Sequence, residues 1–122
     1  MVVGVTKMNS FKIGKKKISN NSKTYFIADI AANYDGSLSR ALKLIKLAAK
    51  AGANAAKFQH FKAETIVSDK GFKALGKKFA HQSKWKKSVF EVYSDASINF
   101  SWTPLLQKQC KKYKIDFFTS PY

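Results

Sequence analysis

Short apolar runs alternate with amphipathic stretches along most of this chain. Residues 25–31, Tyr-Phe-Ile-Ala-Asp-Ile-Ala, form a nearly continuous apolar run, and residues 53–59 and 115–119 have a similar character. Runs of this length are typical of strands that are buried on both faces, as in parallel sheets. We therefore predict three strands over these ranges.

Two amphipathic stretches connect these strands and are predicted to be helices. The first follows Ser37, whose side chain suits a helix N-terminus, and ends at Gly52, where glycine supplies the left-handed C-terminal position. The second starts near Ser101 and ends around residues 112–114. The apolar positions recur at helical spacing in both, at Leu38, Ala41, Leu42, Ile45, Ala48 and Ala49 in the first and at Leu106, Cys110 and Tyr113 in the second.

Two further segments complete the chain. Residues 1–23 are polar and basic, and a weak alternation at Phe11, Ile13 and Ile18 around turn residues predicts a small β-hairpin. Residues 60–97 are too long for a simple connection, and their aromatic-bearing stretch at 85–93 predicts a helix. Long insertions of this kind in compact domains are often functional.

The resulting order is β-α-β, an insertion, and then α-β. Alternation of strands and helices indicates an α/β fold with a parallel sheet. By itself this pattern leaves open whether the sheet closes into a barrel or stays doubly wound. No apolar run approaches the ~20 residues that a membrane span requires, and lysines interrupt the first thirty residues where a signal peptide would be apolar. We therefore expect a soluble, cytoplasmic protein.

The net charge of the chain suggests one alternative function. The formal net charge is +16, from 22 lysines, one arginine and seven acidic residues. So basic a chain raises the possibility of a small module that binds nucleic acid or another polyanion. However, the lysines are scattered, and arginine, which specific phosphate and base recognition favours, is almost absent. A lysine-rich surface is the preferred explanation, and we do not expect nucleic acid as a partner.

Candidate chemistry gathers where the predicted strands end. Functional groups in α/β folds concentrate at the carboxyl ends of parallel strands. Polar residues near those ends are Asp29, Asn33, Lys57, Gln59, Thr119 and Ser120. If neighbouring strands lie side by side, Asp29 and Lys57 face each other across ~5 Å. That pair, with the two hydroxyl groups, suits a phosphorylated or carboxylated substrate.

Each of these residues also has a structural interpretation. Asp29 and Lys57 can be a structural ion pair, Asn33 a turn residue, and Ser120 simply the end of a strand. His60 and His81 have no metal-ligand partner at a diagnostic spacing. Cys110 cannot form an internal disulfide because it is the only cysteine, and core packing is its expected role.

Several spaced blocks resemble the sialic acid synthase family, which makes N-acetylneuraminate and related nonulosonates. Residues 26–37, Phe-Ile-Ala-Asp-Ile-Ala-Ala-Asn-Tyr-Asp-Gly-Ser, resemble the opening pattern Ile-Ala-Glu-Ile-Gly-x-Asn-His-x-Gly. Residues 51–59, Ala-Gly-Ala-Asn-Ala-Ala-Lys-Phe-Gln, are similar to the second-strand block Ala-Gly-Ala-Asp-x-x-Lys-Phe-Gln. Residues 81–93 and 117–122 resemble one branch of the same family, so the resemblance extends from about residue 11 to the end.

The resemblance implies a fold and a reaction. The family's catalytic domain is a (β/α)8 TIM barrel, which usually needs roughly 250 residues. Residues 1–23 are then expected to form the basic hairpin segment, and residues 24–122 strands 1–3 of an incomplete barrel. The implied reaction condenses phosphoenolpyruvate with an N-acetylated amino sugar such as N-acetylmannosamine and releases phosphate. A divalent metal, manganese or magnesium, assists it as a Lewis acid.

The resemblance also implies residue roles. Asp29 stands where most members have a catalytic glutamate, and Lys57 matches the lysine that binds phosphoenolpyruvate. Gln59 matches a residue close to the sugar. Ser120 falls near a hydroxyl residue used for phosphoenolpyruvate, and Thr119 and Asn33 are further candidates for substrate binding.

Three departures from the family pattern stand out. Asp29 is one methylene shorter than the usual glutamate, Tyr34 replaces a histidine, and Ala31 replaces a glycine. The family's metal-binding histidines lie on later strands, so no metal ligand is assigned to this chain. We expect the isolated chain to be inactive, with a second copy or a complementary C-terminal part as its partner.

Overall fold

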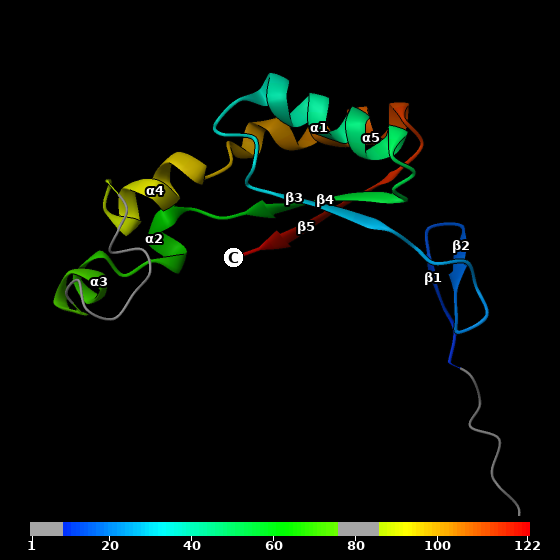
Figure 1. The fold of residues 1–122 in the computed structure, drawn as a ribbon, viewed down its shortest axis with the longest axis horizontal. Helices are drawn as coiled ribbons and strands as arrows, with labels where there is room; N and C mark the ends of the chain where they lie inside the picture. Colours follow the sequence, from blue (N-terminus) through cyan, green and yellow to red (C-terminus); the bar gives the residue numbers. More distant parts are fainter. Residues whose placement is uncertain (1–8, 76–85) are drawn as a thin grey trace, which may run out of the picture.

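A three-stranded parallel sheet with two helices on one face organises the chain (Figure 1). The structure is a computed structural model that describes residues 9–75 and 86–122. The strands β3 (Ile27–Ala31), β4 (Ala55–His60) and β5 (Asp116–Pro121) lie in the order β3-β4-β5. The helices α1 (Leu38–Lys50) and α5 (Thr103–Lys112) connect them. The predicted α/β fold with a parallel sheet is therefore confirmed, with strand boundaries shifted by one or two residues.

Local chemistry accounts for the limits of α1. The Ser37 hydroxyl accepts a hydrogen bond from the backbone N–H of Arg40 at 3.3 Å, which satisfies one of the free donors of the first turn. At the other end Gly52 has φ +88°, a left-handed conformation that glycine adopts without a Cβ penalty. Both ends of this helix agree with the sequence prediction.

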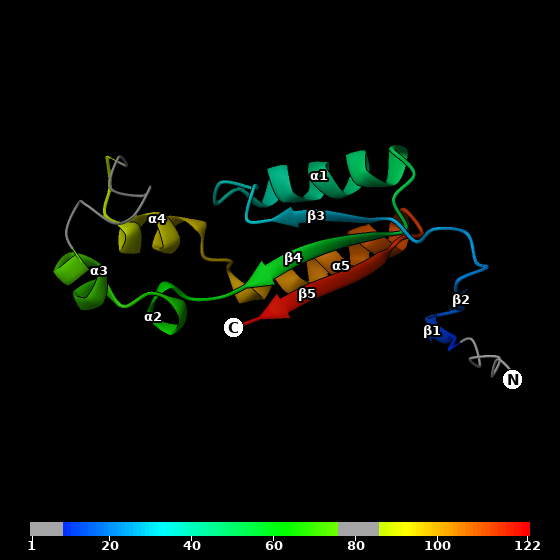
Figure 2. The ribbon, with the colours of Figure 1, turned by 60° about the horizontal axis from the view of Figure 1, so that its bottom comes forward.

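The core lies between the sheet and the two helices. Ile45 of α1, Leu106 of α5 and Phe58 of β4 are fully buried there, and the rings of Phe58 and Phe117 stack with centroids 5.8 Å apart. The other face of the sheet is uncovered by any helix of the described residues (Figure 2). Ile27 on that face is 47% exposed. The prediction of burial on both faces is therefore wrong for the part of the chain that the structure describes, because only one sheet face has a covering layer there.

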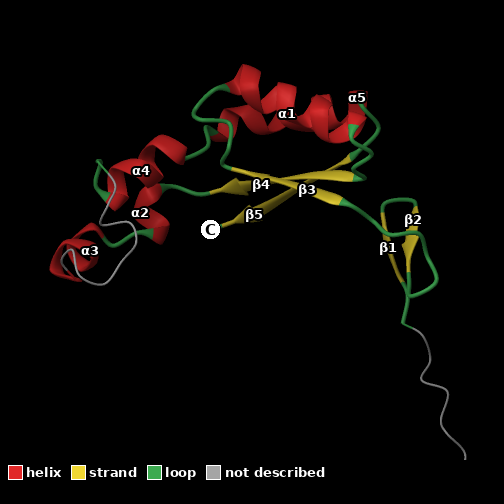
Figure 3. Cartoon of the chain, in the orientation of Figure 1, coloured by secondary structure: helices red, strands yellow, loops and turns green. Residues whose placement is uncertain are grey.

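The remaining elements lie beyond the two ends of the strands. The strands β1 (Phe11–Ile13) and β2 (Lys16–Ile18) form the expected antiparallel hairpin near the amino ends of the sheet strands. Beyond the carboxyl ends lie α2 (Ala63–Ile66), α3 (Asp69–Leu75) and α4 (Val89–Ala96), and a 3-10 turn η2 (Phe100–Trp102) leads into α5 (Figure 3). Within the described ranges no helix is long and apolar enough to cross a membrane.

The insertion differs from the sequence prediction in two respects. Its predicted helix at residues 85–93 is displaced to α4, which a reciprocal capping box between Ser88 and Glu91 starts. The helices α2 and α3 were not predicted, because four and seven residues are too few for a recognisable helical period. His81 and Trp85 lie outside the described residues.

Backbone strain occurs where the first parallel strand ends. Ala31 has φ +50°, a left-handed conformation, next to an irregularity in the pairing of β3 with β4. This conformation costs an L-residue roughly 1–2 kcal/mol. Ala31 stands where the resembling family usually has glycine, for which the cost disappears.

We predict that Ala31→Gly stabilises the chain. The relief of left-handed strain exceeds the entropy cost of a glycine, so the free energy of unfolding should rise by roughly 0.5–1 kcal/mol. Urea denaturation followed by circular dichroism measures the change. Ala28→Gly in the same strand, where φ is negative, is the matched control and should lower stability by roughly 0.5–1 kcal/mol. Equal destabilisation by both variants would contradict the presence of backbone strain at Ala31.

Candidate functional site

The helix-free face of the sheet carries a charged pair on its first two strands. Parallel pairing places Asp29 of β3 directly opposite Lys57 of β4. The Lys57 Nζ donates to Asp29 Oδ2 at 3.3 Å. The side chains are 31% exposed for Lys57 and 56% exposed for Asp29. The expected neighbourhood of the two charges is therefore present, although the pair lies on an open surface and not inside the sheet.

Gln59 and Ser120 extend this face toward the carboxyl ends. They are register partners on β4 and β5, and both are partly exposed. Side chains two residues apart on a strand share a face, so Gln59 follows Lys57 on the same side. Asp29, Lys57, Gln59 and Ser120 therefore share one surface, which we call the strand-end surface.

Thr119 does not belong to the strand-end surface. Its hydroxyl lies 2.5 Å from Nδ1 of His60, on the face that packs against the helices. Alternation along β5 turns Thr119 and Ser120 to opposite sides. The expectation that both hydroxyls point toward one substrate is corrected: only Ser120 faces the Asp29–Lys57 side.

Asn33 serves the turn that follows β3. Its side-chain Nδ2 donates to the carbonyl oxygen of Ile30 at 3.0 Å, and its own backbone N–H donates to the same oxygen at 3.0 Å. Asn33 is exposed beyond this contact. The structure thus shows the turn role that was one of its two interpretations, and its side-chain amide is engaged locally.

Two buried residues near the strand ends were not among the site residues predicted from the sequence. Tyr34 is fully buried, and its hydroxyl donates to the carbonyl oxygen of Ala96 at 2.7 Å, tying the β3–α1 loop to the end of α4. Burial raises the pKa of Tyr34 to about 12, so it stays a neutral donor. His60 is 7% exposed, and burial lowers its pKa. A polar residue directly after an apolar run was the available signal for His60, whereas Tyr34 stands in the polar turn at residues 33–36 and had no such signal.

Metal ligation can be tested against the residues present. Among residues 9–75 and 86–122, no three His, Cys, Asp or Glu side chains lie close enough together to hold a metal ion. Asp29 is a single carboxylate that already accepts from Lys57. The strand-end surface therefore does not fit a metal centre, and its chemistry is that of an anion site: one ammonium, one hydroxyl and one amide, with a carboxylate beside them.

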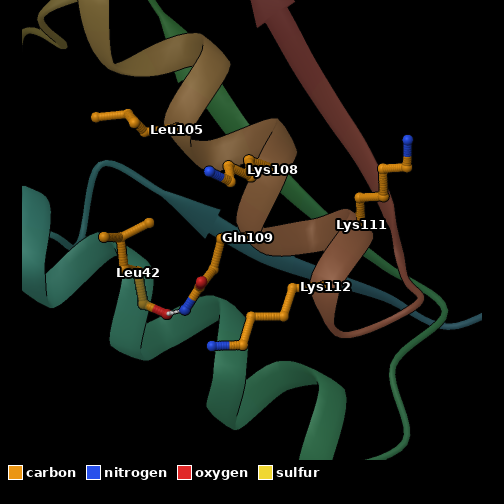
Figure 4. A pocket seen from close by; sticks show the side chains of 6 residues that line it. All are labelled: Leu42, Leu105, Lys108, Gln109, Lys111 and Lys112. Carbon is orange, nitrogen blue, oxygen red and sulfur yellow. Dashed lines mark hydrogen bonds between the residues drawn. The ribbon is translucent and has the colours of Figure 1, made fainter.

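A groove elsewhere on the molecule is distinct from this surface. It lies between α1 and α5 and is lined by Leu42, Leu105, Lys108, Gln109, Lys111 and Lys112 (Figure 4). The Gln109 side chain crosses it and donates to the carbonyl oxygen of Leu42 at 3.1 Å. The groove is on the helix layer and shares no residue with the strand-end surface.

Comparison with known proteins finds a matching family and several relatives of this chain. Residues 44–122 match the model of the NeuB family. Pseudaminic acid synthase of Campylobacter jejuni subsp. jejuni serotype O:2 is 34% identical over 108 residues, which cover 85% of this chain and 30% of that protein. The spore coat polysaccharide biosynthesis protein SpsE of Bacillus subtilis is 30% identical over 116 residues, which cover 93% of this chain and 29% of that protein.

A solved structure shows the same arrangement. It is the N-acetylneuraminic acid (sialic acid) synthetase from Leptospira borgpetersenii serovar Hardjo-bovis in complex with citrate. The match has a TM-score of 0.73 and 27% sequence identity, and it covers 94% of this chain and 35% of that one. The chain thus spans about 30% of the length of the curated relatives that it matches.

We predict that Asp29→Asn has little effect on folding. Because both side chains of the pair are partly exposed, their attraction is screened by water, and the free energy of unfolding should change by less than about 1 kcal/mol. Urea denaturation at low and at high salt measures this. A loss of about 3 kcal/mol or more is typical of a broken buried pair and would show that the surface is covered in solution.

Proposed function

This chain belongs to the NeuB family of nonulosonic acid synthases, and we propose that it forms the part of such an enzyme that binds phosphoenolpyruvate. The complete enzyme joins this substrate to an N-acetylated amino sugar and releases phosphate. The methylene carbon of phosphoenolpyruvate attacks the aldehyde carbon of the open-chain sugar, water adds to the resulting cationic centre, and phosphate leaves with cleavage of the C–O bond.

The convergence of Lys57, Gln59 and Ser120 on the helix-free face carries this proposal. In a (β/α)8 barrel the helices form the outer ring, and ligands bind at the carboxyl ends of the strands. We propose that β3, β4 and β5 are the first three strands of such a barrel. The helix-free face then lines its interior, and the strand-end surface lies where substrates bind.

Each side chain has a chemically distinct task in this proposal. The compact ammonium of Lys57 neutralises the phosphate or carboxylate charge of phosphoenolpyruvate. The Ser120 hydroxyl donates a hydrogen bond to the same anion, and the Gln59 amide can donate to and accept from sugar hydroxyls. Asp29 holds the Lys57 ammonium at the centre of the face and supplies a carboxylate oxygen that can accept a proton.

Asp29 also limits how tightly an anion binds in the isolated chain. Its carboxylate lies 3.3 Å from the ammonium that the substrate would use. A bound phosphate therefore shares Lys57 with a like-charged neighbour, which weakens binding. We further propose that the divalent metal of the complete enzyme takes its ligands from residues other than those described, and we assign no step of the reaction to it.

We predict that the 122-residue chain binds phosphoenolpyruvate weakly and through Lys57. Titration with phosphoenolpyruvate, followed by ¹H–¹⁵N NMR, should shift the amide signals of Lys57, Gln59 and Ser120. Lys57→Gln should weaken binding at least about tenfold, because it removes a charge-assisted hydrogen bond.

The matched control is Lys46→Gln, which removes the same charge from the exposed surface of α1. It should leave the affinity unchanged. An equal loss in both variants, or equally tight binding of a single-stranded oligonucleotide to the same residues, would instead favour a non-specific polyanion-binding module.

We also predict that the chain alone has no synthase activity. Incubated with phosphoenolpyruvate, N-acetylmannosamine and manganese, it should release no phosphate above background, because the described residues do not form a metal centre. A colorimetric phosphate assay measures this, with a full-length NeuB-family enzyme as the positive control. Sustained turnover by the pure chain that Lys57→Gln abolishes would contradict the prediction.

A further inference from the structure

A buried histidine ties together the ends of two strands and the start of a helix. His60 is the last residue of β4, and its ring faces the helix layer at 7% exposure. Its Nδ1 lies 2.5 Å from the hydroxyl oxygen of Thr119 on β5, and its Nε2 lies 2.7 Å from the hydroxyl oxygen of Thr103 at the start of α5. No part of the proposed reaction uses this imidazole.

The surroundings of His60 favour a neutral imidazole with a hydrogen-bond partner at each ring nitrogen. The rings of Phe100 and Phe117 flank it, with centroids 5.3 Å and 6.3 Å from that of His60. A neutral imidazole has one donor and one acceptor nitrogen, and each threonine hydroxyl can serve either. Both nitrogens are therefore satisfied whichever tautomer forms, and the ring joins three separate elements without a buried charge.

The hydrogen-bonded residues His60 and Thr119 are sequence neighbours of two residues of the strand-end surface. His60 follows Gln59 on β4, and Thr119 precedes Ser120 on β5. Gln59 and Ser120 are themselves register partners. Because side chains alternate, holding His60 and Thr119 together on the helix side sets the directions of Gln59 and Ser120 on the other side. The His60 carbonyl oxygen also accepts from the backbone N–H of Tyr122 at 3.0 Å, which extends the pairing past the end of β5.

We propose that His60 is a positioning residue for the strand-end surface. Its two hydrogen bonds keep the carboxyl ends of β4 and β5 in register with each other and with the start of α5. Gln59 and Ser120 are thereby presented side by side to an anionic substrate. This inference rests on the proposed function for its ligand, but the arrangement of the strand ends can be measured without one.

The test compares three variants of the full chain. His60→Phe keeps a ring of similar shape and removes both hydrogen bonds, whereas Thr119→Val removes only one of them and keeps the side-chain shape. Leu106→Ala is the control, because it removes a fully buried core side chain of α5 that takes no part in the His60 hydrogen bonds. Two measurements follow: hydrogen exchange of individual amides, and phosphoenolpyruvate affinity by NMR titration.

In His60→Phe, exchange of the Tyr122 amide should accelerate at least about tenfold, while amides at the amino end of β4 stay protected. Phosphoenolpyruvate affinity should fall about tenfold, and Thr119→Val should give a smaller loss. Leu106→Ala should lower thermal stability without changing the affinity of the folded chain. Unchanged exchange and affinity in His60→Phe, or an equal affinity loss in Leu106→Ala, would overturn the positioning role.

The two proposals fail in different ways. If the wild-type chain does not bind phosphoenolpyruvate, the proposed function of the strand-end surface fails. The contrast in His60→Phe between exchange of the Tyr122 amide and of the amides at the amino end of β4 still decides whether His60 holds the strand ends. If binding is present and depends on Lys57 but not on His60, the proposed function stands and the positioning role is rejected.

Discussion

The parallel pairing of β4 between β3 and β5 is the constraint on which the rest of the structure depends. Both connections return over the same face of the sheet, so α1 and α5 cover one side of it. Alternation along β4 then sends Phe58 and His60 into the core and Lys57 and Gln59 to the uncovered side. A single strand thus contributes both the centre of the hydrophobic core and the middle of the candidate site.

Polar side chains are stabilised in different ways on the two faces of the sheet. On the helix side the buried side chain of His60 has partners for both ring nitrogens. On the open side Lys57 and Asp29 face each other at partial exposure, where water lowers the cost of their charges. The buried polar group therefore stiffens the strand ends, whereas the exposed pair remains accessible to a ligand.

The departures from the family pattern have structural consequences that differ in kind. Ala31 keeps the left-handed backbone that a glycine would adopt freely, so the turn after β3 is retained at an energetic cost. Tyr34 is instead absorbed into the core, where its ring lies 6.0 Å from that of Trp102 and its hydroxyl ties the loop to α4. Ala31 therefore leaves backbone strain near the site, and Tyr34 adds a hydrogen bond that holds the neighbouring loop in place.

The sequence by itself determined the α/β alternation, the hairpin, the caps of α1 and the opposition of Asp29 and Lys57. These follow from local periodicity, local hydrogen bonding and a pairing register that buried apolar runs restrict strongly. The family resemblance in residues 26–37 and 51–59 was likewise present in the order of residues, and the match over 44–122 agrees with it.

Only the tertiary structure decided which side of each strand faces the helices. A nearly continuous apolar run has no alternation from which to read this, so the opposite directions of Thr119 and Ser120 and the exposure of the Asp29–Lys57 pair were not predictable. The contacts of His60 with Thr103 and Thr119 span 43 and 59 residues, and that of Tyr34 with Ala96 spans 62. Such contacts depend on how distant segments pack, and local sequence patterns carry no information about them.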